Sequence, residues 1–450
     1  MVFITLSGFV TALLCLVGWV NSLPSSVADT ERGELLGLGD SVGSAADDYH
    51  WVASWTSMPQ LVESSNMPPS PFSSGGVFKD ATLRQTLHLS LSAERIRIQI
   101  SNTFGGSDLP ITAATIALPT SGKAGVSSID NTTLKPLTFK NGTSEGITIP
   151  RGQVAYTDPI EFPIPGQTNI AISLYFKTGQ TGSSITGHPG SRTTSWMASG
   201  NKVSEANLVG TGSGSTTKDT KHWYFLSAVE AWSPLNTTSA FIILGDSITD
   251  GRGSTDDGNN RWPDLLLARM HQAGINNVGV NNQAAGGNAV LSGGLGPTLL
   301  SRYKRDALQQ QGVKYVMIFE GVNDIGSSST DSGTQNSIAN RLIEAYKQIA
   351  KDCKAAGIKV IGGTITPFGG NGQGYSNPTR EQTRQKVNEW ILGNSGQGKT
   401  FDAVVDFGKI IGDPAAKGQL AKQYDGGDHL HPNVRGYQAM ADGFPLEFFK

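Results

Sequence analysis

Apolar and polar residues alternate along the N-terminal half of the chain, from Trp51 to about Trp232. The stretch 95–101 has isoleucine at every second position, and the stretch 86–91 has leucine at every second position. A period of two is typical of antiparallel strands with one buried face. Residues 92–94 could close a hairpin between these two stretches. Further short strands are predicted at 112–118, 147–149, 170–176 and 223–229.

Gly, Pro, Ser and Thr fill the connections between these stretches, and no long helical pattern interrupts them. The N-terminal half is therefore predicted to form an antiparallel β-sandwich-like domain over residues 49–235. A lectin-like binding module and a scaffold that shapes one wall of an active site are both compatible with this pattern.

The pattern changes at residue 239 to short apolar strands separated by helices. Phe241–Leu244 is apolar without alternation, as in a strand that is buried on both faces. Further strands are predicted at 278–280, 313–319, 359–364 and 403–406, and helices at 262–272, 298–310, 338–356, 379–392 and 433–449. This α/β alternation predicts a doubly wound parallel sheet of five strands over residues 239–450.

The first 22 residues have the pattern of a signal peptide. Val2 to Val20 is almost continuously apolar, and Val20 and Ser22 are suitable residues for a cleavage site. A membrane anchor is the alternative, but no basic stop-transfer cluster follows. Residues 23–48 are small, polar and acidic, which predicts a disordered leader or propeptide. We therefore expect a secreted, extracellular protein whose mature chain has no integral membrane segment.

The composition narrows the possible partners. A formal net charge of −2 argues against a nucleic-acid partner. Cys15 lies in the predicted signal peptide, so the mature chain has one cysteine, Cys353, and no internal disulfide. No ligand set with the spacing of a metal site is evident, so no metal and no cofactor are predicted. Three Asn-x-Ser/Thr sequons are candidates for N-glycosylation, at Asn131, Asn141 and Asn236. The oligomeric state is left open.

Ser247 directly follows the strand at 241–244, at the carboxyl end where open α/β sheets keep their active sites. Near the C-terminus, Asp428 and His431 are three residues apart, so one turn could bring the carboxylate to the imidazole. Such a pair can serve as the base of an acyl-transfer reaction. His429, paired with Asp425, is the alternative base.

Two loops that follow predicted strands are rich in small residues, 282–288 and 320–324. Small residues let a backbone N–H approach a substrate oxygen closely, and an Asn side chain can add a second donor. Each loop taken alone could equally be an ordinary turn from a strand to a helix. Their common position at the carboxyl ends of strands favours a joint role.

Four ordered blocks of this sequence resemble those of the SGNH (GDSL-type) hydrolase family: Gly245-Asp246-Ser247-Ile248, the loop from Asn282 to Gly287, Gly321-Val322-Asn323-Asp324, and Asp428-His429-Leu430-His431-Pro432. The resemblance implies a flavodoxin-like sheet. It differs from the family pattern at Ile248, where the family has Leu, and at Ala284, where Gly is frequent.

The resemblance also assigns roles. Ser247 is the nucleophile, and its backbone N–H is the first donor of an oxyanion hole. The backbone of Gly287 and the side chain of Asn323 are the second and third donors. His431 is the base and Asp428 orients it, because the family pattern Asp-x-x-His-Pro selects His431 rather than its neighbour.

The N-terminal half is similar to an extra domain found in a secreted branch of the family that includes xylan-deacetylating enzymes. The resemblance thus implies a secreted serine esterase that hydrolyses short acyl esters, acetyl above all, on polysaccharides or oligosaccharides. A lipase or lysophospholipase that acts on longer chains is the leading alternative. A carbohydrate-binding protein on an inactive hydrolase scaffold is a further one.

Overall fold

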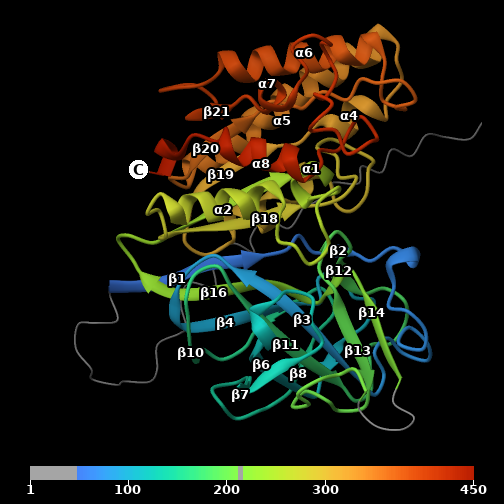
Figure 1. The fold of residues 1–450 in the computed structure, drawn as a ribbon, viewed down its shortest axis with the longest axis vertical. Coiled ribbons are helices and arrows are strands. Elements are labelled where there is room, and N and C mark those ends of the chain that lie inside the picture. Colours follow the sequence, from blue (N-terminus) through green and yellow to red (C-terminus); the bar gives the residue numbers. More distant parts are fainter. Residues whose placement is uncertain (1–47, 211–215, 450) are drawn as a thin grey trace, which may run out of the picture. The chain divides into compact units, whose positions relative to one another are not determined.

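Two kinds of β-sheet follow one another along the chain in the computed structural model, which describes residues 48–210 and 216–449 (Figure 1). The first part is antiparallel and the second is a parallel sheet with helices, as predicted. The predicted signal peptide at 1–22 and residues 23–47 of the predicted leader lie outside the described residues. Residues 46–450 form one unit, and the division into domains at 235 and 239 stays a prediction.

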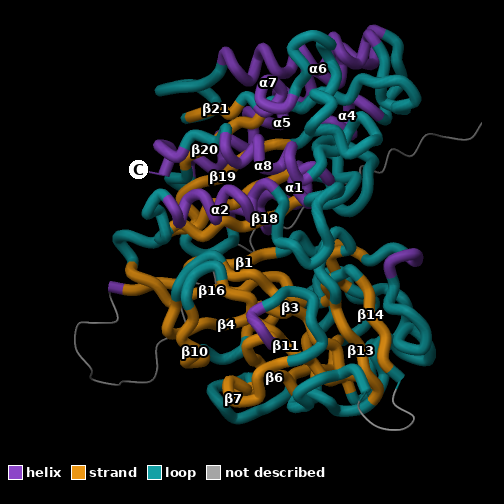
Figure 2. The backbone as a smooth tube through the Cα atoms, in the orientation of Figure 1, coloured by secondary structure: helices purple, strands orange, loops and turns teal. Residues whose placement is uncertain are grey.

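The antiparallel part consists largely of strands (Figure 2) and contains two larger sheets. Both sheets contribute residues to the hydrophobic core. The first joins, in order, β1 (Tyr49–Thr56), β16 (Leu226–Pro234), β4 (Ala93–Ser101) and β10 (Ile160–Ile164), and β9 (Val154–Tyr156) also pairs with β4. The second joins β14 (Thr217–Thr220), β13 (Ser195–Ser199), β3 (Ala81–Leu89), β11 (Thr168–Phe176), β6 (Ala113–Pro119) and β7 (Ile129–Pro136).

Short strands and turns complete this part. A small sheet joins β15 (Trp223–Tyr224), β12 (Thr186–His188) and β2 (Gln60–Leu61), and a two-stranded sheet joins β5 (Leu109–Ile111) and β8 (Ile147–Ile149). Two 3-10 turns are η2 (Ser64–Asn66) and η3 (Thr120–Gly122). The predicted strand at 223–229 is divided between β15 and β16 at Phe225, whose φ is 65°.

The predicted hairpin across residues 92–94 is wrong. β3 pairs with β11 and β13, whereas β4 pairs with β16, β10 and β9, so the chain crosses from one sheet to the other between them. The connection is fixed by contacts outside its own strands. The Ser90 hydroxyl donates to the carbonyl of Val280, and the N–H of Leu91 donates to the Ser54 hydroxyl. Period two identifies strands but not their partners, because the same pattern suits either sheet.

The parallel sheet has the order β18 (Val278–Ala284), β17 (Ser239–Gly245), β19 (Val313–Phe319), β20 (Lys359–Gly363), β21 (Ala403–Val405). This is the flavodoxin-like order, and it confirms the predicted fold. The order reverses at β17, whose neighbours on the two sides are the next two strands in sequence. Ligands bind at such a switch point, outside the carboxyl ends of the strands.

Helices occupy the connections of the parallel sheet: α1 (Ser247–Asp250), α2 (Trp262–Gln272), α3 (Leu299–Tyr303), α4 (Val322–Gly326), α5 (Ser332–Ala355), α6 (Pro378–Gly393), α7 (Phe407–Ile411) and α8 (Val434–Asp442). Right-handed crossovers in this strand order place α2 on one face and α5 and α6 on the other. The helix α8 packs against α2, and α5 packs against α6. Cys353 is buried on α5, as a packed small residue.

Two predicted helices differ from the structure. The one at 298–310 is α3 followed by a π-helical turn, η4 (Lys304–Leu308). The one at 433–449 ends at Asp442, and a 3-10 turn, η5 (Leu446–Phe449), follows. Gly443 and Pro445 stand between them, and both residue types disfavour a continuous helix. In the part of the chain that the structure describes, no helix has the length and apolar composition of a membrane span.

The antiparallel part covers the free edge of the parallel sheet at β18. The Ser90 hydroxyl meets both the N–H and the carbonyl oxygen of Val280, at 3.1 and 2.9 Å. The side-chain amide of Asn281 donates to the carbonyl of Ala53 on β1. A Cβ atom on Gly279 would lie 2.5 Å from that same carbonyl, so this close approach requires glycine. An edge strand that would otherwise be open is thereby closed.

The guanidinium group of Arg302, on α3, is buried at the carboxyl ends of the parallel strands. It donates to the carbonyl oxygens of Gly245 on β17 and Gln283 on β18, at 3.0 and 2.6 Å. The same group pairs with the carboxylates of Asp306 and Glu320, at 3.1 and 2.9 Å. One cation therefore joins the ends of three neighbouring strands.

We expect Arg302→Met to lower the free energy of unfolding by about 3–5 kcal/mol, because removing one partner of a buried ion pair leaves the other uncompensated. The variant also removes one hydrogen-bond donor from each of two buried carbonyl oxygens, those of Gly245 and Gln283. Denaturant unfolding monitored by circular dichroism would measure this loss.

The control is Arg95→Met, which removes the surface pair of Arg95 with Glu161. We expect that change to alter stability by about 1 kcal/mol or less. Equal losses in the two variants would contradict the structural importance of Arg302.

Candidate active site

Ser247 begins α1 directly after β17. Asp246 is the N-cap of this helix, and its carboxylate accepts the N–H of Ile248 at 3.0 Å. The switch from strand to helix occurs within two residues, so Ser247 lies at the carboxyl end of the sheet, as predicted. Its hydroxyl lines a cleft of about 630 Å³ between the two parts of the chain.

A hydrogen-bonded chain of three side chains leads away from the serine. The Oγ of Ser247 lies 2.8 Å from Nε2 of His431, and Nδ1 of His431 lies 2.7 Å from a carboxylate oxygen of Asp428. A carboxylate can only accept, so Nδ1 carries the hydrogen and Nε2 is free to accept the serine proton. The other oxygen of Asp428 accepts the backbone N–H groups of Leu430 and His431.

The surroundings of the histidine favour its neutral form. Burial lowers the pKa of His431, and the positive charges of Arg252 and Arg192 lower it further, while Asp428 acts in the opposite direction. Burial raises the pKa of Asp428, but the backbone and side-chain hydrogen bonds of His431 outweigh it and hold this pKa below its usual value. The pair thus combines a neutral imidazole with an ionised carboxylate at neutral pH.

His429 is directed elsewhere. Its Nδ1 lies 2.6 Å from Asp425, and 41% of its side chain is exposed. Its backbone has a φ of 59°, and it packs beside Gly370. Of the two candidate bases, the structure brings His431 to Ser247.

The two predicted loops lie at the same cleft. Gly287 has a φ of 71°, a conformation that favours glycine, and it lines the cleft together with Asn323. Within residues 48–210 and 216–449, no protein acceptor is recorded for the backbone N–H of Ser247 or of Gly287. Asn282 holds the base of its loop, because its amide donates to the carbonyl of Thr249 on α1.

The amide group of Asn323 has a fixed orientation. Its nitrogen donates one N–H to the carbonyl of Asn288 at 2.7 Å, and its oxygen accepts the Tyr375 hydroxyl at 3.0 Å. The oxygen is therefore turned toward Tyr375, and one N–H of the amide remains for a group in the cleft. Sequence reasoning missed Tyr375, which lies more than fifty residues away along the chain.

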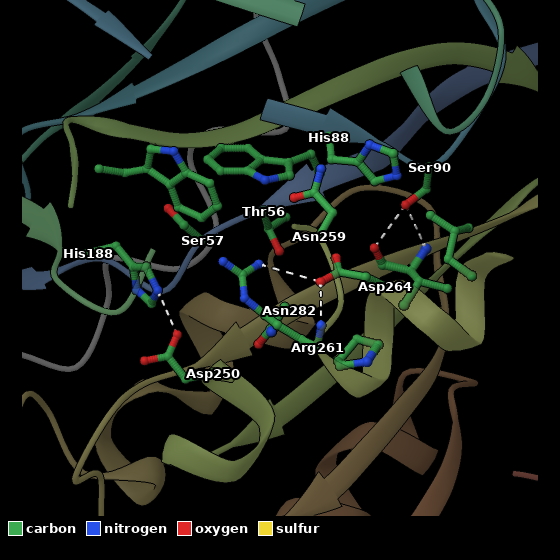
Figure 3. Close-up of a pocket in the computed structure, with 15 residues that line it drawn as sticks. Thr56, Ser57, His88, Ser90, His188, Asp250, Asn259, Arg261, Asp264 and Asn282 are labelled. Carbon is green, nitrogen blue, oxygen red and sulfur yellow. Dashed lines mark hydrogen bonds and ion pairs between the residues drawn. The ribbon is translucent and has the colours of Figure 1, made fainter. Parts of the chain in front are cut away.

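Two further residues that sequence reasoning missed, His188 and Asp250, join the two parts of the chain (Figure 3). His188, on β12, points toward Asp250 on α1, with Nε2 2.8 Å from the carboxylate. The other carboxylate oxygen of Asp250 accepts the N–H of Gly286, next to Gly287. A Cβ atom on Gly190 would lie only 1.8 Å from Asp250, so glycine makes this approach possible. Asp250 lies one turn after Ser247, which is a usable signal, but nothing local marks His188.

Several buried carboxyl groups lie behind the serine. Burial raises the pKa of Asp246 to about 7 and that of Asp324 to about 6, and it raises the pKa of Glu320 well above its usual value despite the nearby Arg302. The carboxylate of Asp324 accepts the N–H groups of Val290 and Leu291 and so holds the loop after Gly287. In the described part of the chain, no group of three or more His, Cys, Asp or Glu side chains is arranged to hold a metal ion.

The parallel sheet has the flavodoxin-like order, and Ser247, His431 and Asp428 form a hydrogen-bonded chain at its carboxyl edge. Residues 243–439 match the model of the GDSL-like Lipase/Acylhydrolase family, and this range includes all five predicted site residues. The C-terminal half of the chain is therefore a GDSL-type lipase/acylhydrolase domain, and this family consists of carboxylic ester hydrolases. No curated protein matches the chain.

Solved structures of similar fold align with about half of the chain. An acetyl xylan esterase from Geobacillus stearothermophilus has 20% sequence identity and a TM-score of 0.36, with 48% of this chain and 96% of that chain covered. The lipase/acylhydrolase from Enterococcus faecalis has 21% identity and a TM-score of 0.34, with coverages of 46% and 92%. A member of the lipolytic G-D-S-L family from Veillonella parvula has 22% identity and a TM-score of 0.33, with coverages of 46% and 96%.

The raised pKa of Asp246 gives an expected dependence of stability on pH. A carboxyl group whose pKa is higher in the folded state stabilises the fold fully below its unfolded value, about 4, and this contribution is lost as the pH rises toward 7. Asp246→Asn mimics the protonated form. Relative to the wild type, its free energy of unfolding should therefore rise between about pH 4 and pH 7, by up to about 1.4 kcal/mol per pH unit.

Asp331→Asn is the matched control, because Asp331 also caps a helix but hydrogen bonds from Thr334 lower its pKa to about 2. Its titration lies below this pH range. If the two variants respond alike, the buried carboxyl group is not the source of the effect.

Proposed function

We propose that this protein is a serine esterase in which Ser247 is the nucleophile, His431 the general base and Asp428 the residue that orients and stabilises the histidine. The observation that carries the proposal is the continuous chain of hydrogen bonds from Ser247 Oγ through His431 to Asp428, at 2.8 and 2.7 Å. It starts at the carboxyl end of β17 and faces an open cleft.

In the proposed reaction, Ser247 Oγ attacks the ester carbonyl while its proton passes to Nε2 of His431. The negative charge of Asp428 stabilises the imidazolium that forms. The proton then passes to the leaving alcohol, and the acyl group remains on the serine. Water, activated by the same histidine, attacks this acyl-enzyme and releases the acid.

The proposed oxyanion hole consists of the N–H groups of Ser247 and Gly287 and the side-chain amide of Asn323. The unused N–H groups of the two backbones and the fixed orientation of the amide support it. Donors held in place before the reaction stabilise developing charge without reorganising, and one such donor contributes about 3–4 kcal/mol.

For the substrate, we propose short acyl esters, in particular acetyl esters, on polysaccharides or oligosaccharides. The cleft is lined by hydrogen-bonding side chains that suit sugar hydroxyls, among them Gln60, Asn66 and Gln373. Aliphatic side chains are fewer, and Leu295 is half-exposed. A long acyl chain would need a more extended apolar surface.

We also propose that the mature protein is secreted and N-glycosylated. The apolar stretch at residues 2–20 supports export, and the side chains of Asn131, Asn141 and Asn236 are all exposed. An enzyme on this route meets extracellular polysaccharide.

The substrate proposal is tested with para-nitrophenyl esters of increasing acyl length, assayed beside the release of acetate from acetylated xylan. We expect kcat/KM to be highest for acetyl and to fall at least about tenfold toward octanoyl, because a polar cleft gains little from added methylenes. Ser247→Ala gives the background. A rate that rises with chain length, without release of acetate from xylan, would favour a lipase or lysophospholipase instead.

The assignment of the base is tested with the two neighbouring histidines. His431→Ala should lower kcat for para-nitrophenyl acetate by about 10³-fold or more, because Ser247 loses its proton acceptor. His429→Ala should keep most of the wild-type rate, since its ring contacts Asp425 and not the serine. The reverse result would show that His429 is the base, and equal melting temperatures would exclude unfolding as the cause.

A further inference from the structure

Two arginine side chains at the cleft have no carboxylate partner. Arg192 lies in the segment between β12 and β13, and Arg252 follows α1; both line the cleft that contains Ser247. Among the described residues, neither guanidinium group makes an ion pair or a hydrogen bond to the protein, and the buried Nε of Arg192 has no partner. Both charges lower the pKa of His431, so both act at the serine end of the cleft.

The carboxylates at the cleft are already engaged with other groups. Asp428 is bonded to His431, and Asp250 to His188. Glu63 accepts from the side-chain amides of Gln60 and Asn66, at 2.6 and 3.0 Å. Lys221 also lines the cleft, and its Nζ lies 3.7 Å from a carboxylate oxygen of Asp256. The two arginines are thus left as positive charges that no protein group neutralises.

The backbone holds Arg192 in a strained conformation. Its φ is 51°, in the left-handed region that a non-glycine residue seldom adopts. The C-terminal half fixes this conformation on both sides. The N–H of Asp257 donates to the carbonyl of Arg192 itself. On the C-terminal side, the carboxylate of Asp257 accepts the N–H and the hydroxyl of Thr194. On the N-terminal side, Arg261 donates to the carbonyl of Ser191. Such strain persists where the surrounding structure over-determines it, and it is frequent at ligand sites.

We propose that Arg192 and Arg252 form an anion subsite of the esterase. The substrate would then be an ester that also carries a carboxylate or phosphate group near the scissile bond, such as an acylated saccharide with uronic acid residues. This inference rests on the proposed esterase function and adds a specificity to it. The two arginines come from the two parts of the chain, so the subsite exists only where the antiparallel part adjoins the hydrolase domain.

The chemistry of the guanidinium group suits this role. It stays charged at any physiological pH, and its planar N–H groups match the two oxygens of a carboxylate or phosphate. A charged hydrogen bond in a partly desolvated cleft is stronger than the same bond at the surface. An anionic ester would be selected over its neutral counterpart, whereas a neutral ester would be hydrolysed nearly as well without the arginines.

The test uses three small acetyl esters at neutral pH: para-acetoxybenzoate, its neutral methyl ester, and para-acetoxyphenyl phosphate. The measured quantity is kcat/KM for each anionic ester divided by that for the neutral ester, with each rate first corrected for spontaneous hydrolysis. We expect Arg192→Gln and Arg252→Gln each to lower this ratio about tenfold, with the rate on the neutral ester changed by less than about threefold. Arg192→Lys should restore part of the ratio.

Arg435→Gln is the matched control. Arg435 is an exposed arginine on α8, outside the cleft, and its substitution removes the same charge as the substitutions in the cleft. If the cleft substitutions lower the ratio for the benzoate alone, the subsite binds a carboxylate. If they lower the ratio for the phosphate alone, it binds a phosphate. An unchanged ratio in both cleft variants, or an equal fall in the control, would overturn the subsite. Absence of wild-type activity on the neutral ester would instead count against the proposed esterase function. If Arg192→Gln fails to fold, Arg252→Gln still tests the subsite, because Arg252 is exposed.

Discussion

The buried guanidinium group of Arg302 is the contact on which the geometry of this molecule depends. It bonds to Gly245 and Gln283 at the ends of β17 and β18 and pairs with Glu320 after β19. The three loops that leave these points lead to Ser247, to Gly287 and to Asn323. A charged group with five donors can fix several backbone and carboxylate oxygens at once, which no apolar side chain could do. The carboxyl ends of the three strands are therefore held together by one side chain directly beneath the proposed catalytic groups.

The antiparallel part contributes to the site as well as covering the sheet edge. His188 holds Asp250, and Asp250 holds the N–H of Gly286, so one side chain of β12 fixes the position of the Gly287 loop. Ser90 meets Val280 on the same strand of the sheet that leads into that loop. The proposed oxyanion donors thus depend on contacts made from outside the hydrolase domain, and removing the antiparallel part would expose both the edge strand and the carboxylate of Asp250.

The sequence predicted the features that depend on local pattern and on the spacing of motifs. Apolar runs located the five parallel strands, and Asp428 and His431 stand within one turn, so their contact needs no long-range information. The hairpin at 92–94 failed because alternation does not specify which strand is the neighbour. Arg302, His188 and Tyr375 were missed for a related reason. Their partners lie far away in sequence. The sequence alone does not distinguish a buried polar residue, which needs hydrogen-bond partners, from an exposed one.

The charges around Ser247 are arranged asymmetrically, and this arrangement links the proposed chemistry to the proposed specificity. Behind the serine, burial raises the pKa of Asp246 and Asp324, so part of the negative charge there is neutralised by protons near neutral pH. In front of it, Arg192 and Arg252 remain charged. The proposed oxyanion hole meets the negative charge that develops in the transition state. The two arginines, which lie outside this hole, favour an anion on the substrate. A cleft that stabilises one negative charge during the reaction can hold a second on the bound ester only if separate donors meet it, and two arginines outside the oxyanion hole provide them.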